Sequence, residues 1–97
     1  MLLLMRESEF QASVVRLAQA LGWKVYHTKN SRRSAPGFPD LVLSRERIIY
    51  AECKTEVGKL SQDQKDWLDS LGGAGGEVYV WRPRCMADIE DILSRRG

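Results

Sequence analysis

The chain has 97 residues, 43% of them hydrophobic and 29% charged, with a formal net charge of +2 at pH 7. This length allows one domain, 1–97, with a modest core, and the composition argues against intrinsic disorder. Its two cysteines lie in no metal-type spacing and exclude a disulfide framework, and the apolar residues 1–5 are too few for a signal peptide or a membrane span. We therefore expect a soluble, intracellular protein without a membrane partner.

The first third of the chain predicts a helix, a strand and a loop. Ser8 can cap the helix, and Gly22 can end it. The apolar positions of this helix recur on one face, at Phe10, Val14, Leu17, Ala18 and Leu21. Residues 23–27 alternate as a strand does, and residues 28–37 are polar and favour a loop.

A β-hairpin is predicted next, because two short apolar runs, 41–43 and 48–51, are joined by the polar residues 44–47. Ser61 then opens a second helix, and the glycine-rich residues 72–76 favour a flexible connection. The apolar stripe of that helix comprises Trp67, Leu68 and Leu71.

The end of the chain predicts a strand over 78–81 and a short helix whose apolar residues follow a helical repeat. These residues are Met86, Ile89, Ile92 and Leu93. The order of elements is therefore α-β-β-β-α-β-α. A strand, helix, strand passage implies a crossover, so the expected fold is α/β, with a mixed sheet flanked by helices.

Two carboxylates and a lysine flank the hairpin. Asp40 lies at the mouth of its first strand, whereas Glu52 and Lys54 share one face of the second strand, opposite Ala51 and Cys53. Two acidic side chains beside an ammonium can hold a hard divalent cation and activate a water, which suits phosphodiester hydrolysis. A Pro-Asp turn and a Glu-x-Lys strand are each common on solvated surfaces. Their occurrence together, in this order and with a hairpin between them, is what favours a functional site.

The segment 10–39 contains basic residues but no Asp or Glu, and it leads into this carboxylate cluster. The basic residues in it are Arg16, Lys24, Lys29, Arg32 and Arg33. A basic segment beside metal-binding carboxylates favours a polyanionic substrate. The alternative is an ordinary basic surface loop.

Four motifs follow one another along the chain. They are Glu9, Gly37-x-Pro39-Asp40, Glu52-x-Lys54 and Gly58-Lys59-Leu60-Ser61-x-x-Gln64-x-x-Trp67-Leu68. This series resembles the VRR-NUC domain, the virus-type replication and repair nuclease branch of the PD-(D/E)xK superfamily, over residues 7–83. The resemblance implies a restriction-endonuclease-like core of the order αβββαβ, followed here by a C-terminal helix.

The resemblance also implies the roles of the residues around the hairpin. Asp40 and Glu52 become the carboxylates that bind Mg²⁺ or Mn²⁺, and Lys54 becomes the catalytic lysine. The backbone carbonyl of Cys53 is implied as an additional metal ligand.

Two further residues receive a role from the resemblance, and each has a local alternative. Glu9 is implied as the metal-binding acid of the first helix, with Glu7 as the second choice, but an acid in a first helical turn also favours the helix dipole. Gln64 is implied as the glutamine beside the catalytic site, but its spacing from Ser61 is also that of a capping box.

Other residues are assigned to DNA or to the core. Lys29, Arg32, Arg33 and Lys59 are candidates for contacts with the DNA backbone, which position a duplex without reading its bases. Trp67 and Trp81 occupy apolar-face positions and are expected in the core, whereas Trp23 suits either the core or a base-stacking role.

The expected function is metal-dependent hydrolysis of DNA phosphodiester bonds. Cleavage is expected to be structure-selective and not sequence-specific, because nothing in the chain resembles a recognition helix or a zinc module. Similarity to standalone phage or bacterial members of the family implies a cytoplasmic repair enzyme that cuts branched DNA, such as four-way (Holliday) junctions, as a homodimer. Two alternatives stay open. One is a non-catalytic DNA-binding subunit with the same fold, and the other is a partner protein whose charged hairpin binds a polypeptide.

Overall fold

The computed structural model describes residues 5–28 and 35–96. Within these ranges the elements are α1 (Glu7–Ala20), β1 (Lys24–His27), β2 (Leu41–Ser44), β3 (Ile48–Cys53), α2 (Gln62–Gly73), β4 (Glu77–Trp81), the 3-10 helix η2 (Pro83–Cys85) and α3 (Met86–Ser94). Apart from the short η2, this is the predicted α-β-β-β-α-β-α order. None of the helices in the described ranges is long and apolar enough to cross a membrane.

The four strands form one sheet in the order β1-β2-β3-β4. The β1–β2 and β2–β3 pairs are antiparallel, whereas β3 and β4 are parallel. A parallel pair needs a crossover connection, and α2 lies within it. The sheet is therefore mixed, as predicted.

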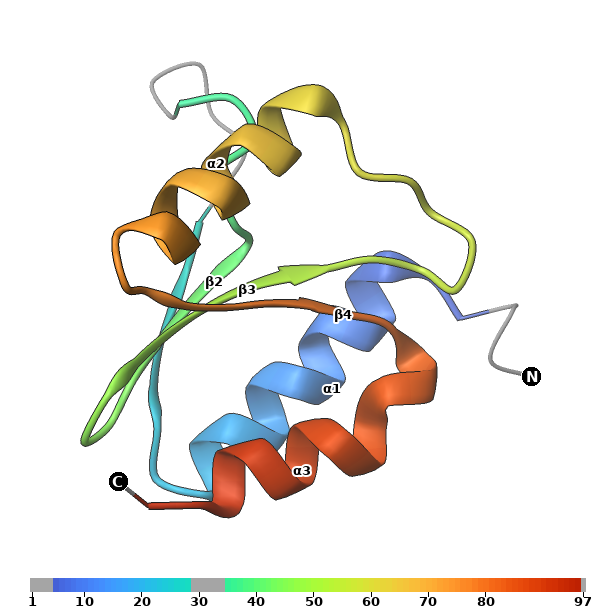
Figure 1. Cartoon of the computed structure of the whole chain (residues 1–97). Helices are drawn as coiled ribbons and strands as arrows, with labels where there is room; N and C mark the ends of the chain where they lie inside the picture. Colours follow the sequence, from blue (N-terminus) through green and yellow to red (C-terminus); the bar gives the residue numbers. More distant parts are fainter. Residues whose placement is uncertain (1–4, 29–34, 97) are drawn as a thin grey trace.

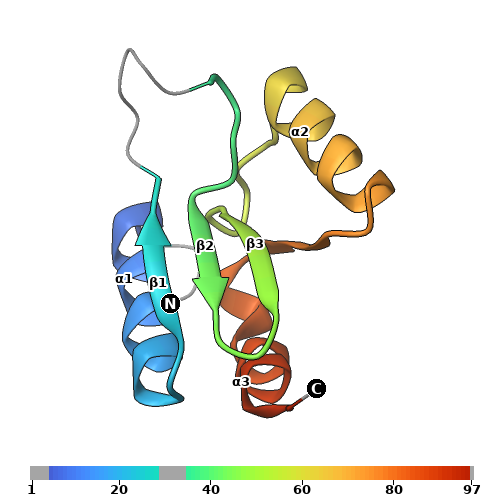
Figure 2. The ribbon, with the colours of Figure 1, turned by 90° about the vertical axis from the view of Figure 1, so that its left-hand side faces the viewer.

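Helices cover both faces of this sheet. α1 and α3 lie next to each other against one face, and α2 lies against the other (Figure 1). The view turned by 90° shows the same arrangement, with β1, β2 and β3 side by side (Figure 2). α1 contacts β1, β3 and α3, whereas α2 contacts β4. The protein thus has three layers, helix, sheet and helix.

The hydrophobic core lies between the sheet and the layer formed by α1 and α3. Its buried side chains are Phe10, Val14, Ala18, Trp23, Leu41, Leu43, Ile49, Ala51, Cys53, Trp81, Ile89 and Leu93. By contrast, α2 has no fully buried residue. The face of the sheet beneath α2 is therefore covered less tightly than the opposite face.

The three tryptophans occupy different environments. Trp81 and Trp23 are buried in the core, and the indole N–H of Trp23 donates a 2.9 Å hydrogen bond to the carbonyl of Leu93 at the end of α3. Trp67 is only half-buried and packs edge-to-face on Phe38, with ring centroids 5.0 Å apart. The core prediction is confirmed for Trp81 and wrong for Trp67, because α2 lies on the side of the sheet away from the main core.

Two helix ends differ from prediction. α1 begins at Glu7 with Arg6 as its N-cap, so Ser8 is not the cap. α2 continues through Gly73, so the expected flexible connection starts two residues late. Gly75 then turns the chain, with a φ of 94°. The hydrogen bonds of α2 continue to its end, where the Ala74 N–H donates to the carbonyl of Ser70.

Candidate active site

The β2–β3 hairpin brings Asp40 and Glu52 together. In its antiparallel register Leu41 pairs with Ala51, and one further step along both strands sets Asp40 opposite Glu52. Side chains directly opposite each other share a face of the sheet, and both carboxylates line one pocket. The N–H of Cys53 donates a 3.1 Å hydrogen bond to Oδ2 of Asp40, which holds this carboxylate at the start of β2.

Glu52 is a buried carboxylate, only 1% exposed. Burial, as the largest cause, and the negative charge of Asp40 together raise the pKa of Glu52 to about 8, although the charge of Lys54 acts in the opposite direction. Its Oε1 atom is buried and receives no hydrogen bond from a described donor, while a hydrogen bond between the Glu52 and Asp40 carboxyl groups also raises the pKa of Glu52. Buried polar atoms are nearly always partnered, so an unpaired carboxylate oxygen is suited to accept a cation.

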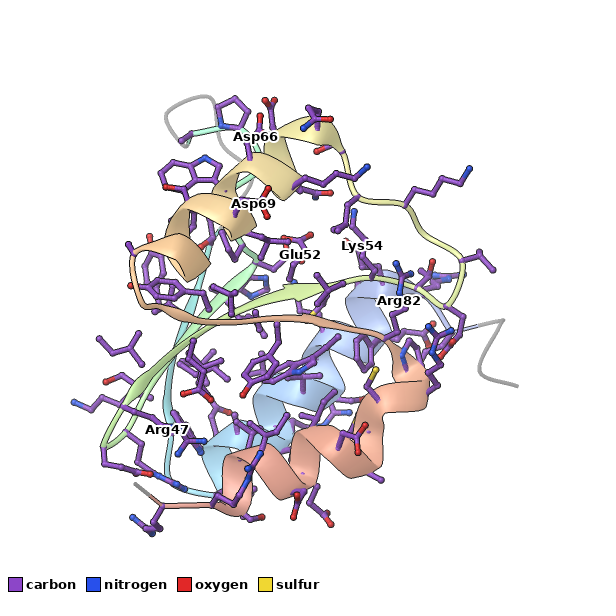
Figure 3. The ribbon with its side chains drawn as sticks, in the orientation of Figure 1. Arg47, Glu52, Lys54, Asp66, Asp69 and Arg82 are labelled. Atoms are coloured by element: carbon purple, nitrogen blue, oxygen red, sulfur yellow. The ribbon has the colours of Figure 1, made fainter. Side chains whose placement is uncertain are left out.

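Lys54 lies beside Glu52, as the alternation along β3 predicts. Its Nζ is 3.9 Å from Oε2 of Glu52, and its side chain is 12% exposed. Figure 3 shows both residues on the α2 side of the sheet, near the end of β3. The ammonium is therefore held next to the carboxylate pair and partly shielded from water.

Arg82 supports the chain that follows Lys54, and nothing in the sequence analysis pointed to it. Its Nη1 donates hydrogen bonds of 2.6 Å to the carbonyl of Thr55 and 2.7 Å to that of Gly58. These partners lie 27 and 24 residues earlier. A contact over that distance leaves no local pattern, so only the tertiary structure could show it.

Gln64 forms the capping box that its spacing predicts, and it also contacts a carboxylate of the candidate site. Its Oε1 accepts a 2.8 Å hydrogen bond from the N–H of Ser61, while Oγ of Ser61 accepts one from the N–H of Gln64, which completes a capping box at the start of α2. Its Nε2 donates a 3.0 Å hydrogen bond to Oε2 of Glu52. The glutamine thus links the start of α2 to the buried carboxylate.

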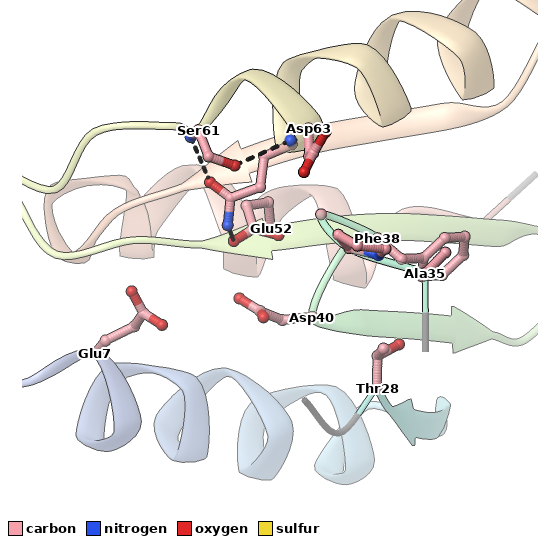
Figure 4. Close-up of a pocket in the computed structure, with 11 residues that line it drawn as sticks. Glu7, Thr28, Ala35, Phe38, Asp40, Glu52, Ser61 and Asp63 are labelled. Carbon is pink, nitrogen blue, oxygen red and sulfur yellow. Dashed lines mark hydrogen bonds between the residues drawn. The ribbon is translucent and has the colours of Figure 1, made fainter. Parts of the chain in front are cut away.

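The acid that α1 contributes to the pocket is Glu7, the second choice of the sequence analysis. Glu7 lines the pocket and points toward Asp40 (Figure 4), and its charge contributes to the raised pKa of Glu52. Glu9 does not line this pocket. It accepts a 3.0 Å hydrogen bond from the N–H of Arg6, so it closes the start of α1. Glu7, and not Glu9, is therefore the acid of α1 that lies at the pocket, and the structure gives no geometric support to Glu9 as a metal ligand.

The pocket itself has a volume of about 350 Å³ and lies where α1, the hairpin and the start of α2 meet (Figure 4). It is also lined by Asp63, a carboxylate that the sequence analysis did not consider. Gly37 allows the loop before Asp40 to lie against the backbone of Asp63, because its φ is 85° and an added Cβ would lie 2.5 Å from that backbone. The loop that precedes Asp40 is thereby pressed against α2.

Cys53 contributes its backbone to this region. Its N–H faces β2 and reaches Asp40, and in a strand the carbonyl of the same residue points to the same edge. β2 pairs with β3 only as far as Ala51, so this carbonyl lies beyond the end of the ladder. Its thiol is buried, and burial raises the pKa of that thiol, which argues against a thiolate ligand.

The predicted DNA-contacting residues are only partly placed. Lys59 is exposed in the loop between β3 and α2. Lys29, Arg32 and Arg33 lie outside the described residues.

The whole arrangement agrees with a known family. The family model of the VRR-NUC domain matches residues 4–84. The chain belongs to the VRR-NUC family. A solved structure of a "VRR_NUC domain protein" is similar to it, with a TM-score of 0.74 and 17% sequence identity over 92% of this chain and 85% of that chain. At this identity the likeness concerns the fold, and the mixed sheet with its flanking helices is consistent with a restriction-endonuclease-like core. A comparison with curated proteins gives no match.

The donor set of this VRR-NUC domain fits a hard divalent cation that is completed by substrate and water. Among the residues that the structure describes, no three His, Cys, Asp or Glu side chains form a metal-binding group by themselves. Mg²⁺ typically uses one or two carboxylates, several waters and phosphate oxygens, not a full protein cage. Asp40, Glu52 with its unpaired Oε1, and the Cys53 carbonyl match that requirement.

Proposed function

We propose that this VRR-NUC domain is a divalent-metal-dependent endonuclease that hydrolyses DNA phosphodiester bonds. The observation that supports the proposal most directly is the meeting of Asp40 and Glu52 in one pocket, with Nζ of Lys54 3.9 Å from Glu52 and one oxygen of Glu52 that receives no hydrogen bond from a described donor. A buried carboxylate oxygen that receives no hydrogen bond is costly to the fold. A function that uses it offsets this cost.

In the proposed mechanism, Asp40, Glu52 and the Cys53 carbonyl would hold Mg²⁺ or Mn²⁺. When bound, the ion would polarise the phosphate and lower the pKa of a water molecule. Lys54 would orient the attacking water and offset the negative charge that develops on the phosphate. Gln64 keeps Glu52 in the orientation that binding requires, through the bond from Nε2.

Cleavage assays test this function. Wild-type protein should cut DNA with Mg²⁺ or Mn²⁺ and not with EDTA, and Asp40→Ala should lower the rate by at least about 100-fold, the usual cost of losing one essential charged group in a site. Asp69→Ala is the matched control, because Asp69 is an exposed carboxylate on α2 that does not line the pocket. Figure 3 shows it on α2.

Two results would contradict the proposal. If Asp40→Ala cuts as fast as wild type, the activity is a contaminant and the site is wrong. If the protein binds DNA in a salt-sensitive way but cuts nothing with either metal, the non-catalytic DNA-binding subunit is the better description.

The proposal extends to branched DNA, with four-way junctions as the substrate implied by standalone members of the family. A panel of junction, flap and plain duplex substrates tests this selectivity, and equal rates on all three would remove it.

A homodimer is the matching proposal for assembly, because symmetrical incision of a junction requires two sites related by a two-fold axis. Its suggested apolar contact, Leu2, Leu3 and Leu4, lies outside the described residues. Size-exclusion chromatography with light scattering on the full chain tests it, and a monomer at all concentrations rejects it.

A further inference from the structure

A second, aromatic pocket lies beside the candidate active site. It has a volume of about 260 Å³ and is lined by Tyr26, Thr28, Ala35, Phe38 and Trp67. Its walls come from β1, the loop before Asp40 and α2, so it is assembled by the tertiary structure. No role in the proposed metal chemistry uses its three aromatic rings.

These rings are exposed to an extent that packing does not explain. Tyr26 is 67% exposed, more than any large hydrophobic side chain of the described chain except Val57. Trp67 and Phe38 are half-buried and meet edge-to-face, at 5.0 Å between centroids. Aromatic side chains usually bury most of their area, so three partly uncovered rings around one cavity are suited to receive another flat ring.

The aromatic pocket adjoins the active site. Thr28, Ala35 and Phe38 line both cavities. Tyr26 of β1 pairs with Val42 of β2. Val42 lies two residues after Asp40, so the side chains of Tyr26, Val42 and Asp40 lie on the same face of the sheet, with Val42 about 7 Å from Asp40 along the strand. A group held among the rings is thus next to a phosphate held at Asp40 and Glu52.

We propose that this aromatic pocket stacks an unpaired nucleobase of the DNA strand whose phosphate is bound at Asp40 and Glu52. The inference rests on the proposed function and specifies its substrate: DNA with an unstacked nucleotide next to the point of cleavage. Aromatic rings bind every base through its π-face, whereas a base inside a continuous duplex must first pay for unstacking. The pocket therefore favours branch points, flaps and gaps over plain duplex.

Thr28 offers the base a polar contact. Its hydroxyl is buried and has no hydrogen-bond partner among the described residues, and the residue lines the wall that the two cavities share. A base edge carries donors and acceptors that can satisfy such a group.

The test measures stacking without cleavage. Two duplexes carry 2-aminopurine, one at an unpaired position beside a gap and one at a paired position, and each is titrated with protein in CaCl₂. Wild type should quench the unpaired probe and bind that DNA more tightly than the duplex. Tyr26→Leu and Trp67→Leu should weaken binding of the unpaired DNA by roughly 5- to 100-fold and leave duplex binding unchanged.

Ile48→Ala is the matched control, because Ile48 is a 52% exposed apolar residue at the far end of the hairpin. Tyr26→Leu is the decisive variant, since so exposed a residue is not needed for folding. If wild type shows no quenching, or if Tyr26→Leu binds both DNAs as wild type does, the inference is wrong. If Tyr26→Leu alters only the oligomeric state, the pocket binds protein instead. Cleavage of junction, flap and duplex DNA with Mg²⁺ reports on the proposed function independently, because it does not depend on the 2-aminopurine signal.

Discussion

Gln64 donates a 3.0 Å hydrogen bond from Nε2 to Oε2 of Glu52, while its Oε1 completes the cap of α2 through Ser61. One side chain therefore joins the start of a helix to a buried carboxylate on the sheet. Because α2 has no fully buried residue of its own, this polar link is part of what positions α2 over the site.

Replacing Gln64 and Ser61 separately should distinguish the cap from the site. Both Gln64→Ala and Ser61→Ala remove half of the capping box, so each should lower the free energy of unfolding by about 1 kcal/mol. Only Gln64→Ala leaves Oε2 of Glu52 without its donor, and we expect it to weaken Mn²⁺ binding by about 10- to 100-fold, as loss of a ligand's supporting partner does. Urea denaturation and calorimetric Mn²⁺ titration measure the two effects. Equal Mn²⁺ affinities for the two variants would show that Gln64 acts only as a cap.

Gly37→Ala should disturb the site through the loop that carries Asp40. Gly37 and Gly75 both have positive φ values, 85° and 94°. A Cβ at Gly37 would meet the backbone of Asp63 at 2.5 Å, whereas a Cβ at Gly75 would meet none of the described residues within 4 Å. Gly75→Ala should therefore cost about 1 kcal/mol in backbone conformation alone. Gly37→Ala should cost clearly more and also slow cleavage, and thermal melts with kinetics compare the two. Similar losses in both variants would contradict the close approach.

The raised pKa of Glu52 predicts how the stability of the metal-free protein depends on pH. The native carboxyl has a pKa of about 8 against an ordinary 4.5, so between these values the folded protein holds a proton that the unfolded chain releases. The free energy of unfolding should therefore fall as pH rises through this window and level off above it. Metal binding requires the ionised carboxylate, so affinity for Mn²⁺ should rise over the same range.

Glu52→Gln tests the origin of this pH dependence. The amide imitates the protonated carboxyl, so urea melts in EDTA from about pH 5 to about pH 9 should show a flatter profile than wild type. The variant should also be more stable than wild type at the alkaline end and inactive in cleavage. A slope identical to that of wild type would assign the pH dependence to other groups.

Arg82→Ala should loosen the segment that follows Lys54. The guanidinium bonds to the carbonyls of Thr55 and Gly58, and hydrogen bonds that involve a charged group contribute about 1.5–3 kcal/mol, so we expect a loss of about 2 kcal/mol together with a lower kcat. Arg84→Ala is the control, because that side chain is 66% exposed in its pair with Glu56 and surface pairs contribute about 0–1 kcal/mol. If Arg82→Ala changes stability but not kcat, Arg82 does not position Lys54.

Local sequence patterns were sufficient to predict the order of helices and strands and the pairing of Asp40 with Glu52 at the hairpin. The alternation along β3 placed Glu52 and Lys54 on one face, and the short turn set Asp40 opposite Glu52, because register in a hairpin follows from its length. The family resemblance, which the match over residues 4–84 confirms, followed from the same spacing.

The choice between Glu7 and Glu9 was beyond sequence reasoning, because both lie in the first turn of α1 and only the direction of the helix decides which one reaches the pocket. The exposure of Trp67 was also beyond sequence reasoning. Its place in the apolar stripe of α2 predicts a core position, but the main core lies on the other side of the sheet.

What the sequence determined by itself is therefore the part of the protein governed by near neighbours, namely the order of elements and the acid pair of the hairpin. The tertiary structure alone decided which distant side chains complete the site. The role of Arg82, the choice of Glu7 over Glu9 and the aromatic pocket around Tyr26 depend on how α1, α2 and β4 pack on the hairpin. Contacts between residues far apart in the chain arise from the packing of whole layers, which no local periodicity encodes.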